Sequence, residues 1–128
     1  QLILLILELS SKKLKNQRES IQAQNKINEI KKIIKDSDFA SIPTIKEICN
    51  IVKLSNYQVQ KMFKDIEKIS ISEYIVKQKM HYAKELLNEG NLSILEIAYE
   101  VGYENPSKFS KVFKKYYGLL PSKFKEYQ

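Results

Sequence analysis

The sequence predicts an all-α protein, and three observations support this fold class. Helix-start signals, in which Ser or Thr is followed three residues later by Glu or Gln, recur along the chain. One pattern of apolar, small and basic residues occurs twice, about fifty residues apart. No stretch shows the alternation of apolar and polar residues that a half-buried strand requires. We therefore expect short helices that pack around a repeated unit.

The helix starts can be located because a capping side chain accepts a hydrogen bond from a free backbone N–H. The cap signal occurs at Thr44-x-x-Glu47, Ser55-x-x-Gln58, Ser70-x-x-Glu73 and Ser93-x-x-Glu96. Asn105-Pro106 marks another start, because proline at the first helical position loses no hydrogen bond. Gly90-Asn91 is typical of a left-handed helix end. These signals and the apolar spacing predict helices at about 27–36, 44–52, 56–65, 72–88, 94–101 and 105–116, with a last turn after Pro121.

The N-terminal part differs in composition from the rest of the chain. Residues 2–9 are nearly all apolar, and Leu7, Leu14 and Ile21 follow at seven-residue spacing. A helix that buries this stripe against a partner is expected, but Ser10, Gln17 and Gln24 fill the second heptad position and do not favour a long coiled coil. Because residues 11–26 are polar, we place a domain boundary near Asn25, between a helix or linker at 1–24 and a domain at 25–128.

Composition limits the classes of function. The formal net charge of +7 and the pI of about 9.4 favour a polyanionic partner, either nucleic acid or an anionic membrane surface. The apolar run at 2–9 is far shorter than the roughly 20 residues that span a bilayer, and it lacks the flanks of a signal peptide. The lone Cys49 lies on an apolar helix face and His81 has no partner ligands, so neither a metal nor a cofactor is expected. No paired carboxylates, activated nucleophile or phosphate loop suggests an enzyme.

The repeat can be followed residue by residue. Glu47-Ile48-Cys49 with Val52 recurs as Glu96-Ile97-Ala98 with Val101, and Lys61, Phe63 and Lys64 recur as Lys111, Phe113 and Lys114. Thr44 corresponds to Ser93, and Tyr74 corresponds to Phe124. The spacing is 49 residues for the first set and 50 for the second, so the second copy holds one inserted residue.

Each copy has the features of a helix–turn–helix, in which one helix supports a second that lies in the major groove of DNA. Cys49 and Ala98 supply the small residue at the helix crossing, and Gly102 supplies the tight turn. Lys53 stands at the matching turn of the first copy, where a left-handed backbone would cost a lysine about 1 kcal/mol. Apolar anchors follow at matching places, Val59, Met62 and Phe63 in the first copy and Phe109, Val112 and Phe113 in the second.

The outer faces of the two second helices are polar and basic. The first presents Asn56, Tyr57, Gln60, Lys61 and Lys64, and the second presents Ser107, Lys108, Ser110, Lys111, Lys114 and Lys115. Between Asn105 and Gly118 there are four lysines and no acid. Lysine-rich faces are often merely solvated. Their repetition beside apolar anchors nevertheless predicts binding to double-stranded DNA.

The same residues resemble the AraC/XylS family of bacterial transcription regulators. Residues 94–124, ILEIAYEVGYENPSKFSKVFKKYYGLLPSKF, are similar to its C-terminal signature. Residues 44–64, TIKEICNIVKLSNYQVQKMFK, are similar to its first helix–turn–helix, and ISEYIVKQKMHYAKELL resembles the helix that joins the two. The resemblance covers about residues 25–128. Lys53 and Lys68 depart from it where the family usually has glycine, and Pro106 departs at a position that sometimes contacts bases.

The resemblance implies a seven-helix domain with two lobes and a transcription-regulating function in the cytoplasm. Its units would span about 44–64 and 94–115, held by a central helix at about 72–88, and would enter successive major-groove segments of promoter DNA. By position, base contacts fall on Asn56, Tyr57, Gln60, Lys61, Ser107, Ser110 and Lys111. Phosphate contacts fall on Ser55, Lys64, Asn105, Lys108, Lys114 and Lys115. RNA polymerase is a further expected partner.

Three interpretations remain open at the level of sequence. Arg18 is the only arginine, and lysine does not bind guanine in the forked manner of arginine. The shortage of arginine therefore favours A·T-rich contacts, although a lysine-rich overall composition explains it equally well.

The two units are expected to differ in role. Gln60 suits base reading and the lysines near Lys111 suit phosphate binding, so we expect the first unit to discriminate sequence and the second to bind the DNA backbone. Alternatively, residues 1–24 are the working part of a helical interaction module. The family resemblance offers a reading between the two, because such regulators often carry an N-terminal effector or dimerisation domain. Since the chain begins with Gln, residues 1–16 would be the end of such a missing domain, through which the protein would form a homodimer.

Overall fold

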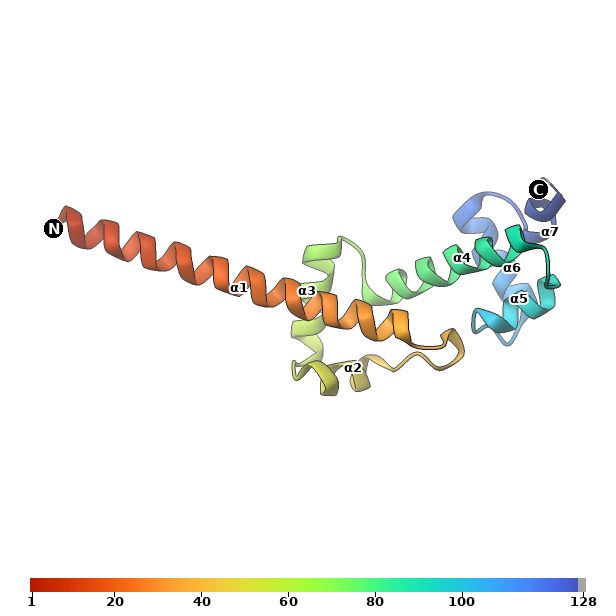
Figure 1. The fold of residues 1–128 in the computed structure, drawn as a ribbon, viewed down its shortest axis with the longest axis horizontal. Helices are drawn as coiled ribbons and strands as arrows, with labels where there is room; N and C mark the ends of the chain where they lie inside the picture. Colours follow the sequence, from red (N-terminus) through yellow and green to blue (C-terminus); the bar gives the residue numbers. More distant parts are fainter. Residues whose placement is uncertain (127–128) are drawn as a thin grey trace.

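The computed structural model describes residues 1–126, and this range is helical with no strand (Figure 1). The elements are α1 Leu2–Asp36, the short 3-10 helix η1 Phe39–Ser41, α2 Ile45–Val52, α3 Asn56–Glu67, α4 Ile71–Glu89, α5 Ile94–Glu100, α6 Pro106–Tyr117 and α7 Pro121–Glu126. The predicted all-α class is confirmed. Each helix predicted from residue 44 onward agrees with an observed helix to within two residues at either end. Only η1 has no counterpart among the predicted helices.

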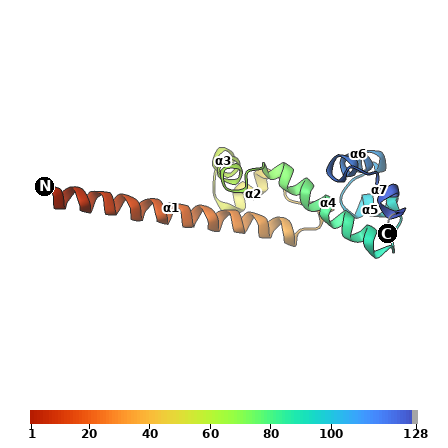
Figure 2. The same cartoon turned by 90° about the horizontal axis from the view of Figure 1, so that it is seen from above.

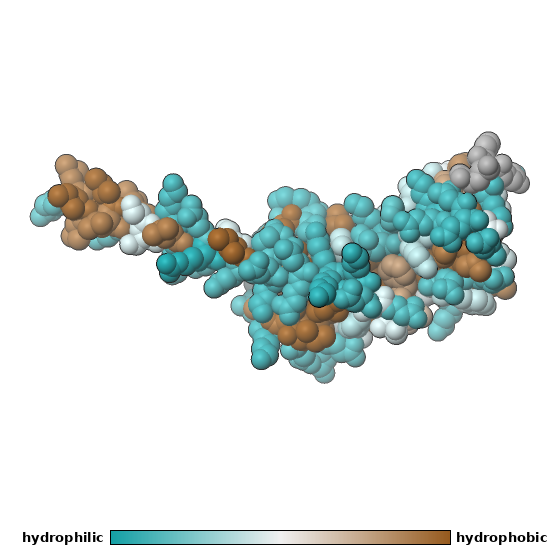
Figure 3. All heavy atoms as spheres, in the orientation of Figure 1, coloured by the Kyte–Doolittle hydropathy of each residue, from teal (hydrophilic) through white to brown (hydrophobic). Residues whose placement is uncertain are grey.

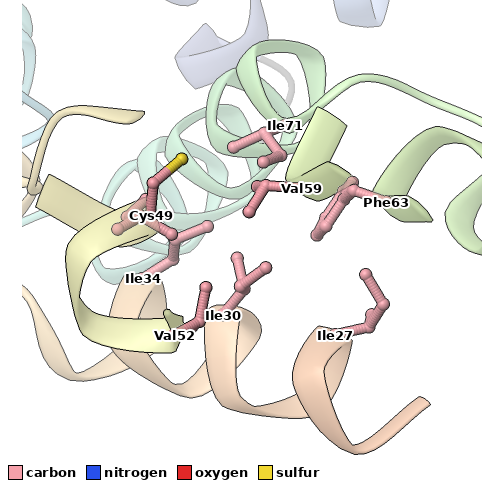
Figure 4. Packing of buried hydrophobic residues seen from close by; sticks show 9 residues of the cluster. Ile27, Ile30, Ile34, Cys49, Val52, Val59, Phe63 and Ile71 are labelled. Carbon is pink, nitrogen blue, oxygen red and sulfur yellow. The ribbon is translucent and has the colours of Figure 1, made fainter. Parts of the chain in front are cut away.

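The helices form two lobes that share α4. The first lobe holds the C-terminal half of α1 with α2, α3 and the start of α4, and the second holds the rest of α4 with α5, α6 and α7 (Figure 1). In Figure 4 the buried side chains of the first lobe converge from all four of its helices. These are Ile27, Ile30, Ile34, Ile48, Cys49, Val52, Val59, Phe63 and Ile71. Cys49 therefore fills the core, as predicted.

The repeat seen in the sequence is also a repeat in packing. The ring of Phe63 meets Tyr74 edge-on at 5.4 Å between centroids, and Phe113 meets Phe124 edge-on at 5.7 Å. Both pairs join the helix that follows the turn to the helix beyond it. The predicted correspondence of Tyr74 with Phe124 is therefore confirmed in three dimensions.

In this repeat, α4 supports the second lobe as α1 supports the first. Ile27, Ile30 and Ile34 of α1 are buried under α2 and α3. Met80, Ala83 and Leu87 of α4 recur with the same spacing of three and then four residues, and are buried with α5 and α6. This spacing places each set on one face of its helix, so both lobes are three-helix units built on one supporting helix.

The helix α1 is longer than the sequence predicted. We expected a helix at 27–36 after a separate polar segment, whereas α1 runs without a break from Leu2 to Asp36. No glycine or proline occurs within it, and its many Leu, Lys, Gln and Glu residues have high helix propensity, so nothing local stops the helix near Asn25. Its side chains begin to pack only near Ala23, and those of residues 2–9 are exposed (Figure 3). No helix among the described residues is long and apolar enough to cross a membrane.

The predicted caps form, with differences in detail. The Thr44 and Ser55 hydroxyls accept hydrogen bonds from the backbone N–H groups of Glu47 and Gln58. In turn, the side-chain oxygens of Glu47 and Gln58 accept from the backbone N–H groups of Thr44 and Ser55. Ser70 also caps its helix, by accepting from the Glu73 N–H. Ser93 caps α5 as well, but its hydroxyl donates to the Glu96 carboxylate at 3.0 Å. Local hydrogen bonds therefore account for these helix starts.

The helix ends require left-handed backbone at several positions. Gly90 ends α4 with φ of +74°, as predicted. Lys53 and Lys68 adopt φ of +59° and +67° at the ends of α2 and α3. The left-handed conformation considered at Lys53 is therefore present, and the side chains of both lysines are exposed.

Candidate DNA-binding surface

The helices that follow the two turns, α3 and α6, lie on one side of the molecule. In Figure 2, α3 lies above α1 and α6 lies above α4, so the supporting helices are together on the opposite side. The fold thus brings the two predicted recognition helices to a common face, although their sequences are fifty residues apart.

Helix α3 is held by its apolar face and exposes the predicted contact residues. Val59 and Phe63 are completely buried beneath it. On the outer face, Asn56, Tyr57, Gln60, Lys61 and Lys64 are all exposed, and the Tyr57 side chain is 73% exposed. An aromatic ring that is so exposed is available for contact with a base or a thymine methyl group.

The polar groups of α3 interact with one another. The Gln60 amide Nε2 donates to the Asn56 Oδ1 at 2.6 Å, which orients the two side chains as a pair. The Lys61 Nζ lies 3.1 Å from the Asp65 carboxylate, and this hydrogen bond and ion pair raise the pKa of Lys61. Because both side chains are exposed, the pair contributes little to stability. It does offset part of the positive charge that Lys61 would bring to DNA.

Helix α6 presents the more basic face. Ser107, Lys108, Lys111, Lys114 and Lys115 are exposed, whereas Ser110 is partly buried beside the anchor Phe109. In α3 the two lysines are matched by Asp65 and Glu67, whereas α6 contains four lysines and no acid. Lys115 occupies the place that Asp65 has in the first copy. The positive potential of the common face is therefore concentrated over α6.

The first turns of the two helices also differ. In α6 the Asn105 Oδ1 accepts from the N–H groups of Ser107 and Lys108 at 2.8 and 3.4 Å, the Asn105 carbonyl accepts from Phe109, and Pro106 has no N–H. Every backbone N–H group in the first turn of α6 therefore donates a hydrogen bond within the protein. In α3, Ser55 takes the N–H groups of Gln58 and Val59, and the first two N–H groups have no partner within the helix. We expected backbone binding of a phosphate at both helix starts, but only the first turn of α3 has N–H groups without a partner in the helix.

Several lysines far away in sequence support the site and were not predicted. The Lys31 Nζ pairs with the Glu67 carboxylate at the end of α3, and the Lys26 Nζ donates to the Val52 carbonyl at 2.9 Å. The Lys79 Nζ of α4 lies 5.2 Å from the centre of the Tyr103 ring, and burial, with Lys108 nearby, lowers the pKa of Lys79. These lysines hold the turns and recognition helices on their supporting helices. No local pattern marks them, because each partner is at least 24 residues away.

The exposed, basic surface of α6 beside α3 is suited to binding a polyanion. Among residues 1–126, no group of three or more His, Cys, Asp or Glu side chains could hold a metal ion. Two exposed helices on one face, with buried apolar anchors and a basic outer surface, define a helix–turn–helix DNA-binding domain.

Comparisons with known proteins identify the family within this class. A family model described as a helix-turn-helix domain matches residues 48–127. The chain is 38% identical over 100 residues to the Msm operon regulatory protein of Streptococcus mutans, covering 78% of this chain and 36% of that protein. It is 34% identical over 82 residues to the probable transcription factor PqrA of Proteus vulgaris, covering 64% of this chain and 67% of that protein.

A solved structure is similar in both fold and sequence. The C-terminal domain of AraT, a response regulator from Geobacillus stearothermophilus, superposes with a TM-score of 0.75 at 28% identity, covering 80% of this chain and 85% of that chain. The chain belongs to the AraC/XylS family of bacterial transcription regulators and contains its DNA-binding domain. The chain spans about a third of the length of the Streptococcus mutans relative and two thirds of the Proteus vulgaris one.

Proposed function

We propose that this domain binds promoter DNA with α3 and α6 in successive major-groove segments and thereby regulates transcription. The observation that supports this most directly is the common face of α3 and α6, each backed by buried anchors (Figure 2). Successive segments of the major groove on one side of a duplex are one helical turn, about 34 Å, apart. The domain would act in the cytoplasm at the nucleoid. RNA polymerase is a proposed further partner.

The contacts divide into base reading and backbone binding. We assign base contacts to Asn56, Tyr57, Gln60, Lys61, Ser107, Ser110 and Lys111, and phosphate contacts to Ser55, Lys64, Asn105, Lys108, Lys114 and Lys115. The side-chain oxygens of Ser55 and Asn105 already cap their helices, so these residues would act mainly by holding the first turns in place. We assign no catalytic activity, metal or cofactor to this domain.

The two recognition helices would share the work unequally. Helix α3 carries the paired amides of Gln60 and Asn56 and the exposed Tyr57, but its charge is balanced by acids. Helix α6 carries four lysines without an acid and a first turn whose N–H groups are taken. We infer that α3 contributes more to sequence discrimination and α6 more to affinity. Since glutamine pairs bidentately with adenine, A·T-rich sequence is expected under α3.

Selection of binding sites from random DNA, followed by mobility shift, tests this assignment. The wild-type domain should enrich A·T-rich half-sites under α3. Gln60→Ala should relax the preference at one or two positions there, at a cost of about 1–3 kcal/mol on the selected site. Lys111→Ala should weaken binding under α6. Specific binding that both changes leave intact would contradict the contact assignment, and G·C-rich sequence under α3 would contradict the specificity claim.

A second function, dimerisation through α1, is favoured by one observation. An apolar patch at the start of α1 is exposed to between 51 and 76% per residue, and exposing such a patch to water is unfavourable (Figure 3). It consists of Leu2, Ile3, Leu4, Leu5, Ile6, Leu7 and Leu9. If residues 1–24 dimerise the chain, light scattering should give twice the monomer mass, and deletion of these residues should restore the monomer. A monomer in both cases would remove this proposal without affecting DNA binding.

A further inference from the structure

The connection between α1 and α2 is twice as long as its counterpart in the second copy. Residues 37–44 join α1 to α2, whereas residues 90–93 are enough to join α4 to α5. Because the two units otherwise repeat closely, four residues would serve in the first as well. The longer connection contains η1, whose start is capped by the Asp38 side chain accepting from the Ala40 N–H at 3.2 Å. It is therefore an ordered insertion.

The insertion crosses from the first lobe to the second. The Phe39 ring lies 5.5 Å from the ring of Tyr82 on α4, and η1 packs against α5. The Phe39 carbonyl lies against the turn at Gly102: a Cβ built on Gly102 would be 3.0 Å from the Phe39 carbonyl carbon and closer still to its oxygen. We call this set of contacts, made by Phe39 with Tyr82 and Gly102, the interlobe contact.

The interlobe contact explains why the two turns differ in sequence. Both turns have left-handed backbone, with φ of +59° at Lys53 and +85° at Gly102. The turn at Lys53 is exposed, so a side chain fits there at a modest backbone cost. The turn at Gly102 has the Phe39 carbonyl in the place of a side chain. The glycine is therefore needed by the neighbouring lobe as well as by the turn.

The two lobes do not share a core. Their cores are separate clusters, and α4 is the helix that contributes to both. A groove of about 760 Å³ lies between α1 and α4, and its walls include Lys31 and Tyr74 of the first lobe and Tyr82 and Glu85 of the second. A single helix with a groove beside it can bend and twist. A second attachment is needed to hold α3 and α6 at one distance and angle.

We propose that the interlobe contact sets the orientation of α3 relative to α6 and so determines the spacing of half-sites that the domain accepts. This inference rests on the proposed DNA binding. Phe39 and Tyr82 are positioning residues, because they act through the placement of the recognition helices. Two linked binding modules gain affinity only where their geometry lets both bind at once. A rigid link therefore gives high affinity for one spacing of half-sites, whereas a loose link gives similar affinity for several spacings.

The test compares affinities for a selected site with those for the same site carrying one base pair more or fewer between its half-sites. The wild-type domain should bind the altered spacings at least about 10-fold more weakly. Phe39→Ala and Tyr82→Ala should each reduce this difference to about 3-fold or less, chiefly by losing affinity for the original spacing. Phe39→Tyr, which keeps the ring, should retain the wild-type preference.

Tyr99→Ala is the matched control, since Tyr99 is an exposed aromatic residue of α5 with no ring contact among the described residues. It should keep the wild-type spacing preference. If Phe39→Ala and Tyr82→Ala bind DNA and keep that preference too, the inference is wrong while the proposed function stands. If the wild-type domain binds no DNA, the proposed function itself fails.

A measurement without DNA tests the interlobe contact independently of the proposed DNA binding. Residual dipolar couplings of the free wild-type domain should fit a single alignment tensor for both lobes, because the lobes move as one body. In Phe39→Ala each lobe should fit its own tensor while its internal couplings stay unchanged, which shows that both lobes remain folded. Independent lobes in the wild-type domain would overturn the inference.

Discussion

Replacing Gly102 by alanine is expected to destabilise the domain by about 2–5 kcal/mol. The backbone there has φ of +85°, where a Cβ costs about 1–2 kcal/mol. The new methyl group would also overlap the Phe39 carbonyl, and forced repacking of this kind costs about 1–3 kcal/mol. The loss is a large fraction of the stability of an ordinary domain.

The same substitution at Gly90 separates the two causes. Gly90 has φ of +74°, and a Cβ built on it would meet nothing within 4 Å. Gly90→Ala should therefore show only the backbone cost of about 1–2 kcal/mol. The difference between the two losses in the free energy of unfolding gives the cost of the overlap between the new methyl group and the Phe39 carbonyl of η1.

Urea denaturation followed by circular dichroism gives both free energies of unfolding. Amide hydrogen exchange should locate the additional loss of Gly102→Ala in α5 and α6, the helices on either side of the turn. Equal losses at Gly90 and Gly102 would mean that the Phe39 carbonyl adds nothing and that backbone conformation alone requires glycine.

Converting Lys108, Lys114 and Lys115 together to glutamine is expected to weaken DNA binding about 100- to 1000-fold at low salt. These side chains are exposed on α6, where no acid balances them. Each lysine that neutralises a phosphate releases a counterion, so the slope of log affinity against log salt should become shallower by about 3. Affinity for specific and non-specific DNA should fall together, because phosphates carry no sequence information.

An equal change of charge elsewhere is the control. Lys12, Lys32 and Lys35 are exposed residues of α1. The helix α1 lies on the opposite side of the molecule from α3 and α6 (Figure 2). Their conversion to glutamine should change the slope by much less than about 1. Mobility shifts at several salt concentrations make the comparison. Similar losses in the two variants would show that net charge, rather than the α6 face, dominates binding.

Local signals account for most of the helix boundaries. The caps at Thr44, Ser55 and Ser93 act within three residues of the helix start, so a linear pattern contains all the partners. The end of α4 at Gly90 follows from the freedom of glycine at positive φ. The N-terminal part was predicted less well, because polar residues with high helix propensity do not reveal whether a helix continues.

The candidate site was predictable because it is repeated. The recurrence of Phe63 and Lys64 as Phe113 and Lys114 located both the buried and the exposed faces of α3 and α6, and the structure places them so. The inequality of the two faces was only partly visible. The ion pair of Lys61 with Asp65 and the occupied first turn of α6 depend on side-chain positions as well as on sequence.

The sequence by itself determined the helical class, the two helix–turn–helix units, the buried and exposed faces of their second helices and the family, because each depends on periodicity or on neighbours within a few residues. The tertiary structure alone decided that α1 is continuous and that η1 reaches the second lobe. Phe39, Tyr82 and Gly102 are far apart in the chain and share no pattern, and the packing of the two lobes brings them together. The repeat therefore specifies two DNA-binding units, and contacts outside the repeat set how those units are held together.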